Sequence, residues 1–382
     1  MKINSLKFNN STIHKMYHGD ELVNKIGDAF TYMEASGDTP TPPTPTHDYS
    51  QDYLTTESLE DGNTISFTMG TGMTTAITTA VTSVSVSTDD GVTWTSMENI
   101  GAGASLSVTL DTGEKAIWKG EALGYSIATA STKSTSFSST GLYKVYGNIL
   151  SLLYDDDFLN QDKPILPDFN CFTNLFYDSR DLMDASNLFM QFTLIDATKR
   201  PIGYLFRGCT NLIAAPELGN IDFASAPYAF RDMFHDCTSL TTAPALTATT
   251  LSSGCYSNMF QGCTSLTTAP ELPAEILTDY CYRLMFSGCT SLTTAPELPA
   301  TVLAQHCYSN MFNGCTSLNY IKCLAISISA TNCTYYWVNG VSSTGTFHKA
   351  AMMCDWTTGY SGIPSGWTVD PDDCGVSAGD AD

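Results

Sequence analysis

Two kinds of hydrophobic spacing divide this chain. From about residue 49 to residue 147, apolar residues alternate with Ser and Thr, as in SVSVSTDDGVTWTSM and LSVTLDTGEKAIWKG. A period of two is typical of β-strands, and Asp90-Gly91 and Thr112-Gly113 are turn signals between them. Several short strands at this spacing predict a β-sandwich over residues 49–147. Trp94 and Trp118 are interpreted as core or edge residues rather than a ligand platform.

The second half repeats one pattern of Phe, Cys and Leu. The repeated cysteines are separated by 237−209 = 28 residues and then by 26, 26 and 26, and a Phe precedes each by three residues. A fixed period between about 20 and 29 residues is typical of a leucine-rich-repeat solenoid. We therefore predict a β-rich, multidomain chain with a solenoid of α/β repeats and a C-terminal cap over residues 148–369. The repeated pairs are Phe206/Cys209, Phe234/Cys237, Phe260/Cys263, Phe286/Cys289 and Phe312/Cys315.

One repeat alone cannot be stable. Each large apolar side chain contributes on the order of 1.5–3 kcal/mol when buried, whereas ordering the backbone costs about 1–2 kcal/mol per residue. Stacking lets each repeat bury both flanks, so the array is stable only as a whole. Within a repeat, the CYSNMF run predicts a short helical turn and the CTSL segment is expected to lead into a strand.

These repeats resemble the BspA-like leucine-rich repeats. The resemblance covers about Phe176 to Val369 and rests on Phe, two residues, Cys, two residues, Leu. Such repeats occur in surface proteins of gut bacteria and their phages, so the resemblance implies an outward-facing binding role. The closing run from Gly345 to Val369 is similar to the atypical unit that ends such arrays.

The first 48 residues have a different composition. Residues 37–48 form a Pro/Thr linker, which predicts an extended spacer. Residues 1–36 resemble the N-terminal docking segments of phage virion proteins, and fibres of gut phages that infect Bacteroidales, including crAss-like ones, are the nearest resemblance. This implies contact with a virion capsid or tail protein through residues 1–36. The residues that carry the resemblance are Lys15, Tyr17, Gly19, Asp20, Leu22 and Val23.

Charge and composition narrow the range of partners. The chain has 39 acidic and 17 basic side chains, a net charge of −22, and only 15% charged residues. This charge repels nucleic acid and anionic membranes, so we expect neither as a partner. No stretch reaches the roughly 20 apolar residues of a membrane span, and MKINSLKFNN does not read as a secretory signal. Residues 370–382 form an acidic tail.

No catalytic or metal-binding pattern is visible in the sequence. Of the 13 cysteines, two series recur at equivalent repeat positions, which favours buried free thiols over zinc ligation; they are Cys209, Cys237, Cys263, Cys289 and Cys315, and Cys255, Cys281 and Cys307. The run from Asp155 to Asp157 is interpreted as a solvated loop rather than a calcium site. Glu271 and Glu297 occupy equivalent repeat positions, which favours a structural role over glycoside cleavage. We therefore expect no enzyme activity, cofactor or bound metal.

Recognition is the function that remains. One repeat slot holds an aromatic ladder that could bind a host-surface glycan or protein, or could simply pack between coils. The sequence predicts a structural virion protein, either a head fibre or a capsid decoration, which is a homo-oligomer on the virion surface and serves in host attachment. The alternatives are a bacterial cell-surface adhesin of the same repeat family and a polysaccharide-cleaving appendage. The ladder residues are Phe230, Tyr256, Tyr282 and Tyr308.

Overall fold

A computed structural model provides the fold of this chain. It describes residues 6–8, 11–13, 51–70, 81–97, 100–122, 135–160, 166, 171–190, 202–218, 226–354 and 356–370. The chain divides into two units, Met1–His47 and Asp48–Asp382.

The first unit contains one described hairpin. Strands β1 (Leu6–Phe8) and β2 (Ser11–Ile13) pair antiparallel. The predicted linker at residues 37–48 lies outside the described residues, as does the acidic tail after Asp370. The predicted docking residues also lie outside them, so their role stays a prediction: Lys15, Tyr17, Gly19, Asp20, Leu22 and Val23.

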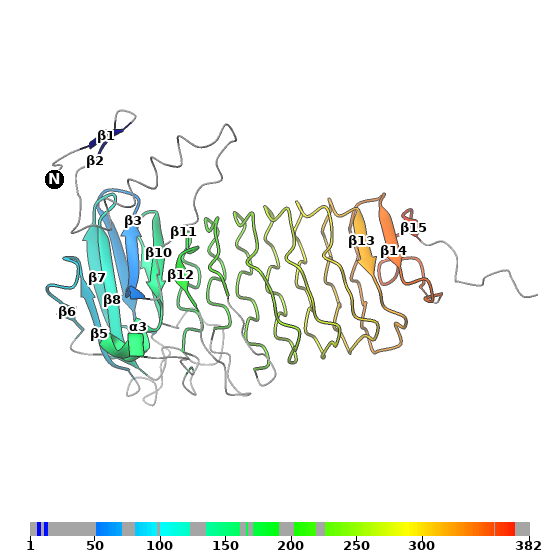
Figure 1. The fold of residues 1–382 in the computed structure, drawn as a ribbon, viewed down its shortest axis with the longest axis horizontal. Coiled ribbons are helices and arrows are strands. Elements are labelled where there is room, and N and C mark those ends of the chain that lie inside the picture. Colours follow the sequence, from blue (N-terminus) through cyan, green and yellow to red (C-terminus); the bar gives the residue numbers. More distant parts are fainter. Residues whose placement is uncertain are drawn as a thin grey trace, which may run out of the picture. The chain divides into compact units, whose positions relative to one another are not determined.

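The second unit begins with two sheets (Figure 1). A seven-stranded sheet has the order β11-β10-β3-β8-β5-β6, with β12 also pairing with β10. A three-stranded sheet has the order β7-β4-β9. The larger sheet consists of β3 (Leu54–Ser58), β5 (Val81–Ser87), β6 (Thr95–Ser96), β8 (Lys115–Ala122), β10 (Tyr143–Asn148), β11 (Leu182–Asp184) and β12 (Leu188–Phe189). The smaller sheet consists of β4 (Asn63–Thr68), β7 (Ser105–Leu110) and β9 (Ser136–Ser139).

Alternating side chains explain the Ser- and Thr-rich strands. In β4, Ile65 and Phe67 are fully buried, while the intervening Ser66 pairs its hydroxyl with that of Ser107 at 2.8 Å. Because successive side chains of a strand point to opposite faces, one face enters the core and the other forms a network of hydroxyl groups. The alternation of apolar and polar residues thus decides which face of the smaller sheet is buried.

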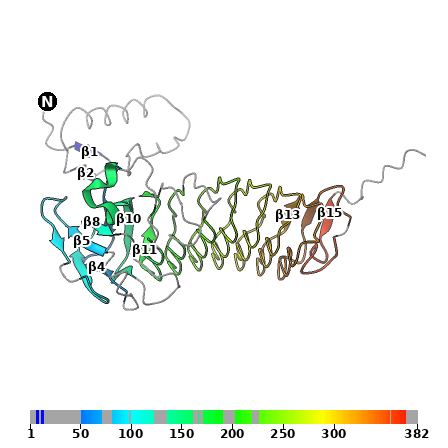
Figure 2. The same ribbon diagram turned by 90° about the horizontal axis from the view of Figure 1, so that it is seen from below.

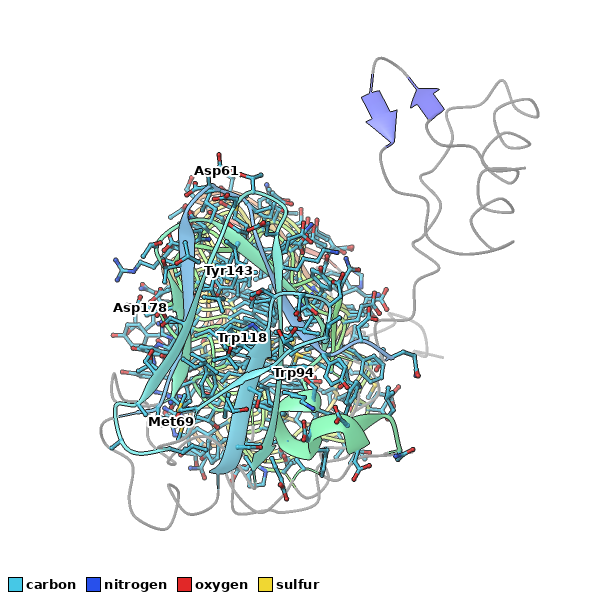
Figure 3. The ribbon with its side chains drawn as sticks, turned by 90° about the vertical axis from the view of Figure 1, so that its left-hand side faces the viewer. Asp61, Met69, Trp94, Trp118, Tyr143 and Asp178 are labelled. Carbon is cyan, nitrogen blue, oxygen red and sulfur yellow. The ribbon has the colours of Figure 1, made fainter. Side chains whose placement is uncertain are left out.

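Aromatic rings join the two sheets into one core. The Trp118 ring of β8 lies 5.1 Å from Phe137 of β9 and 6.5 Å from Phe67 of β4, measured between ring centroids. The Trp118 Nε1 donates a hydrogen bond to Thr56 Oγ1 at 2.9 Å. Figure 3 looks onto this end of the unit, with Trp118 and Tyr143 in the interior. Trp118 is therefore a core residue.

The predicted β-sandwich is not a separate two-sheet body. Strand β10 pairs in parallel with β11 and β12, both of which follow residue 148. In the sequence, the helix α3 (Ser151–Tyr154) and the 3-10 helix η2 (Asp155–Asn160) lie between β10 and β11. The Lys119 Nζ lies 3.0 Å from Asp155 and 2.8 Å from Asp156, so both carboxylates are paired with a lysine. The larger sheet thus continues directly into the repeats.

The repeats are built from overlapping tight turns (Figures 1 and 2). Within one coil the Met259 N–H donates to Tyr256 O at 3.2 Å, whereas the next N–H, that of Phe260, donates to Met285 O at 2.9 Å on the following coil. Donors therefore alternate between closing a turn and joining coils. The 26-residue period places equivalent residues side by side, as in the parallel bridge between Thr242 and Thr268.

The predicted α/β leucine-rich-repeat solenoid is wrong. Among the described residues the one α-helix is the four-residue α3, and the second unit has three sheets, none of which is closed or runs through the repeats. The predicted helical turn is replaced because Gly254, Asn258 and Gly262 have φ values of 62°, 60° and 76°. A right-handed helix cannot continue through left-handed residues four apart. The prolines of the APELPA segments also lack the N–H that a regular strand ladder requires.

Phenylalanine rings and thiols fill the centre of the coils. The Phe260 ring stacks 5.6 Å from Phe234 and 5.8 Å from Phe286. The Cys263 thiol donates to Phe234 O at 3.1 Å. All twelve described cysteines are free, and every one except Cys354 is buried. The constant spacing of Phe and Cys along the repeats thus corresponds to a column of packed side chains in the interior.

A small parallel sheet closes the described array. Strands β13 (Tyr320–Cys323), β14 (Thr346–Lys349) and β15 (Thr368–Asp370) pair in that order. Trp337 is fully buried, and its ring stacks 6.2 Å from Tyr308 and 5.5 Å from Trp356. Trp337 therefore continues the stack of Tyr282 and Tyr308, while Val338 occupies the slot of the phenylalanines.

Candidate functional site

The predicted aromatic ladder lies in the core. Phe230, Tyr256, Tyr282 and Tyr308 expose only 1–2% of their surface. The Tyr256 and Tyr282 rings stack 5.9 Å apart, and those of Tyr282 and Tyr308 stack 6.2 Å apart. A ligand cannot reach these rings from outside without separating the coils. These four rings therefore pack between coils and do not form a recognition surface.

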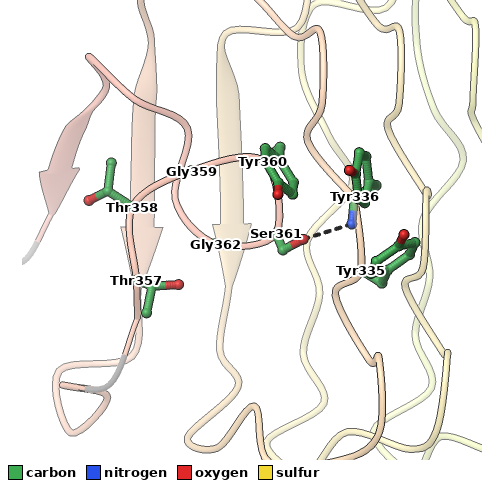
Figure 4. A pocket seen from close by; sticks show the side chains of 8 residues that line it. All are labelled: Tyr335, Tyr336, Thr357, Thr358, Gly359, Tyr360, Ser361 and Gly362. Atoms are coloured by element: carbon green, nitrogen blue, oxygen red, sulfur yellow. Dashed lines mark hydrogen bonds between the residues drawn. The ribbon is translucent and has the colours of Figure 1, made fainter.

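An exposed tyrosine cluster lies on the last coils. The ring centroids of Tyr335 and Tyr336 are 4.5 Å apart, and those of Tyr336 and Tyr360 are 4.3 Å apart. Tyr335 and Tyr360 expose 48% and 53% of their surface. These rings line a pocket of about 560 Å³ (Figure 4). The pocket lining is completed by Thr357, Thr358, Gly359, Ser361 and Gly362.

Hydrogen bonds fix the loop that carries Tyr360 against the preceding coil. The Tyr336 N–H donates to Ser361 Oγ at 2.9 Å, as drawn in Figure 4, and the Thr334 hydroxyl donates to Ser361 O at 2.9 Å. The buried Trp337 Nε1 donates to Gly362 O at 2.8 Å. These bonds join the backbone next to Tyr335 and Tyr336 to the loop that carries Tyr360, so they fix the two sides of the pocket relative to each other.

A glycine is required where this loop reverses. A Cβ atom at Gly362 would lie 1.8 Å from the backbone oxygen of Thr357, which no side chain tolerates. The Gly359 N–H closes the reversal by donating to Ile363 O at 2.8 Å. This close approach places Thr357, Thr358 and Tyr360 around one opening.

Hydroxyl groups provide the polar side-chain atoms of the pocket. A side-chain hydrogen bond with Tyr360 raises the pKa of Tyr336 above its usual value of 10.0. Three phenols, two threonine hydroxyls and the Ser361 hydroxyl surround the opening, and no acidic or basic side chain lines it. Pockets of about 300–1,000 Å³ that combine aromatic surface with a few polar groups are typical ligand sites.

Several described side chains with catalytic potential contact a neighbouring side chain. His306 stacks on Tyr280 with 4.8 Å between ring centroids, and Glu297 pairs with Lys322 at 3.0 Å. His348 pairs with Asp370 at 2.9 Å. Within the described ranges, no group of three or more His, Cys, Asp or Glu side chains is placed to hold a metal ion. The described helices also include none long and apolar enough to cross a membrane.

Comparison of this chain with protein-family models, curated proteins and solved structures gives no match. The resemblance to BspA-like repeats and to phage docking segments therefore stays a prediction.

The tyrosine pocket was missed because it lies where the repeat pattern breaks. The run CYSNMFNG at residues 307–314 becomes CTYYWVNG at residues 333–340, so Ser309 and Asn310 are replaced by Tyr335 and Tyr336. This change is visible in the aligned repeats. Its partner Tyr360, however, belongs to the irregular closing segment, and only the fold brings it to Tyr336.

Proposed function

We propose that this chain is a non-catalytic binding protein whose stacked coils present the tyrosine pocket to a hydroxyl-rich ligand, such as a glycan of a host cell surface. The cluster of the exposed Tyr335 and Tyr360 with the half-buried Tyr336 carries this proposal. Tyrosine rings offer an apolar face against which a sugar ring can stack, and their hydroxyls accept and donate hydrogen bonds at the edge. The Thr357 and Thr358 side chains add hydroxyl groups beside these rings.

A glycan explains the pocket better than a charged ligand does. The opening is lined by Tyr, Thr and Ser side chains and by two glycines. It has no Asp, Glu, Lys or Arg in its lining. Rigid tyrosines lose little conformational entropy on binding, so an exposed cluster held by core hydrogen bonds favours recognition. A host-surface protein is the second ligand class that such a surface fits.

Binding to a panel of neutral glycans tests the ligand class. Tyr360→Ala is expected to weaken binding by about tenfold or more, since it removes one wall of the pocket. Tyr280→Ala is the matched control, because Tyr280 is a partly exposed tyrosine that stacks on His306 away from the pocket. Equal binding by the Tyr360→Ala variant and the native chain would remove the pocket from the proposal.

We further propose that the chain is a virion protein, a head fibre or capsid decoration, which attaches to a capsid or tail protein through residues 1–36 and assembles as a homo-oligomer. Support comes from the resemblance of Lys15, Tyr17, Gly19 and Asp20 to virion docking segments and from the Pro/Thr linker that follows. The many uncharged hydroxyl groups on its strands suit an outward-facing surface, and the net charge of −22 keeps neighbouring copies soluble.

Mass spectrometry of purified phage particles tests this location. The chain is expected among the particle proteins, and deletion of residues 1–36 is expected to remove it while the remaining chain still folds. The bacterial adhesin predicts instead that the chain is found in the envelope of uninfected cells. A polysaccharide-cleaving appendage predicts a loss of viscosity when the chain is incubated with host capsule.

A further inference from the structure

One buried carboxylate gathers three cationic or ionisable side chains from two adjacent coils. The Asp232 carboxylate accepts a hydrogen bond from Arg231 Nε at 2.9 Å and lies 2.7 Å from His235 Nδ1. The Arg207 Nη1 of the preceding coil is 3.8 Å away. The Asn258 Nδ2 of the following coil donates to the same carboxylate at 3.1 Å. We call Arg207, Arg231, Asp232 and His235 the Asp232 cluster.

The two arginines of the cluster are held in place but remain accessible. The side chain of Asp232 is only 2% exposed, whereas those of Arg207 and Arg231 are 30% and 31% exposed. Both guanidinium groups lie over the buried Tyr204 ring, at 5.7 and 5.8 Å from its centroid, and Arg231 also lies 5.8 Å from the Tyr228 centroid. A guanidinium that is already fixed by a ring and a carboxylate loses little freedom when it binds a ligand.

The repeat itself does not require this cluster. The coils that follow hold Asn258, Leu284 and Asn310 in the slot of Asp232. His235 likewise shares its slot with Gln261 and Ser287. The later coils keep only Arg283 of these charges and lack the acidic and histidine partners, so packing does not explain why the full set lies on two coils of a chain with net charge −22.

We propose that Arg207 and Arg231 bind the carboxylate of an acidic sugar, such as a uronic acid unit of a surface polysaccharide. Arginine presents paired N–H donors that match the two oxygens of a carboxylate. Asp232 neutralises only part of the positive charge, and it holds the arginines in position from the buried side. Tyr228, which is partly exposed, supplies an aromatic surface beside Arg231.

Asp236 limits which anions fit. Its exposed carboxylate lies 3.4 Å from His235 Nε2, so a negative charge flanks the cluster on that side. A sugar carboxylate brings one negative charge to the arginines, whereas a phosphate monoester brings up to two and is repelled more strongly by Asp236. The cluster therefore fits an acidic sugar better than a polyphosphate.

This inference rests on the proposed function for its biological role, but its site and ligand differ from those of the tyrosine pocket. The slot that holds Arg231 and Asp232 on one coil holds Tyr335 and Tyr336 four coils later, since 335−231 = 104 is four periods of 26. Both sites therefore lie on the same face of the coils. A polysaccharide with neutral and acidic units could contact both.

Titration calorimetry of the full chain with oligogalacturonate, and with neutral galactose oligomers of the same length, tests the cluster. Double substitution of Arg207→Gln and Arg231→Gln is expected to weaken oligogalacturonate binding by about tenfold or more, because two charge-assisted pairs are lost. Neutral binding is expected to stay unchanged. Arg283→Gln is the matched control, since Arg283 occupies the slot of Arg231 two coils later.

Removing both arginines leaves the buried Asp232 carboxylate with fewer partners and could unfold the coil. Arg207→Lys with Arg231→Lys keeps both charges but removes the paired donors, so it is expected to weaken oligogalacturonate binding while thermal unfolding stays close to that of the native chain. Absence of oligogalacturonate binding by the native chain, or native affinity in the double lysine variant, overturns the inference. Loss of neutral binding in Tyr360→Ala, with acidic binding retained, separates failure of one site from failure of the other.

Discussion

A single phenylalanine in each coil keeps the stack continuous. The Phe206 ring stacks at 5.5 Å on Phe234, which in turn stacks at 5.6 Å on Phe260, and their planes differ by only 2°. Each ring contacts a copy of itself above and below, so it stabilises two coil interfaces at once. The cysteine that follows three residues later fits beneath the ring as a small apolar group and donates its thiol proton to a backbone oxygen, as Cys263 does to Phe234.

Substitution of Phe260 by Ala is expected to lower the free energy of unfolding by about 3–5 kcal/mol, because the cavity separates rings on both neighbouring coils. Phe260 is fully buried. Thr267→Ala, on the exposed surface of the same repeat, serves as the control and is expected to change stability by about 0.5 kcal/mol or less. Chemical denaturation measures both, and similar values for the two variants would contradict the assignment of the phenylalanines to the core.

Tight turns, and not helices or long strands, are the elements of each coil. Alternate backbone N–H groups close a turn within the coil or donate to the next coil. The second kind of N–H is therefore paired only where another coil follows. Glycine occurs where this path needs a left-handed residue without a side chain, as at Gly262, Gly288 and Gly314 with φ between 76° and 78°. The repeat is therefore a unit of hydrogen bonding as well as of packing.

Deletion of residues 264–289 removes one complete period and is expected to leave a folded, somewhat less stable chain. The new junction brings Thr290 to the position of Thr264 after Cys263, and the sequence of slots is preserved. Deletion of residues 264–276, which removes half a period, misaligns every later coil and is expected to unfold the array. Circular dichroism and thermal unfolding compare the two, and equal stability would show that register between coils is unimportant.

The tyrosine pocket depends on one close backbone approach. On the native backbone, the methyl carbon of Gly362→Ala would lie 1.8 Å from the Thr357 backbone oxygen. The loop therefore has to move. We expect glycan binding to fall by about tenfold or more, with little change in the unfolding of the coils. Gly101→Ala is the control, because no atom lies within 4 Å of a Cβ at Gly101. Native affinity in the Gly362→Ala variant would show that the loop geometry does not determine binding.

Across the second unit, buried thiols link stability to alkaline pH. Burial raises the pKa of Cys255, Cys315 and Cys323 from the ordinary value of 9.0 to about 12. Their full contribution is present below pH 9, and it is lost as the pH rises towards the folded pKa, because the unfolded chain alone releases these protons. We expect each such thiol to reduce the free energy of unfolding by about 1.4 kcal/mol per pH unit above 9.

Chemical denaturation at several pH values measures this dependence. The slope between pH 9 and 11 is expected to be smaller in Cys255→Ala by the contribution of one thiol, whereas stability below pH 8 loses only packing. A stability that is constant up to pH 11 would contradict the burial of the thiols.

The repeat period and the residues of the packed column could be read from the sequence, but the backbone conformation of the coils could not. Phe260 and Cys263 recur at fixed offsets because the same interior position recurs, and such a pattern is visible in a single chain. The same spacing fits a strand-and-helix repeat equally well, which is why the α/β solenoid was expected. Left-handed residues such as Asn258 and Leu284 are not recognisable as such in the sequence, so the turns were missed.

The candidate sites, too, depend in part on contacts that the sequence does not contain. Tyr282 recurs in register, which fits either a surface ladder or packing between coils, and its neighbours cover it, since stacking buries whatever points between coils. Tyr335 breaks the repeat at the slot of Ser309, whereas Tyr360 lies in the irregular closing segment, and the contact between the two segments is made by the folded loop. Residues that break a repeat are the signal that sequence reasoning can use, and Arg231 and Asp232 are a second example.

By itself, the sequence determined that equal lengths of chain stack around a column of Phe and Cys, because a period with fixed apolar offsets can bury them only against their own copies. The tertiary structure alone decided which aromatic residues are inside and which are exposed. That choice depends on how each turn directs its side chains and on which neighbouring coil covers them, and both follow from backbone angles and long-range contacts that a one-dimensional pattern does not contain.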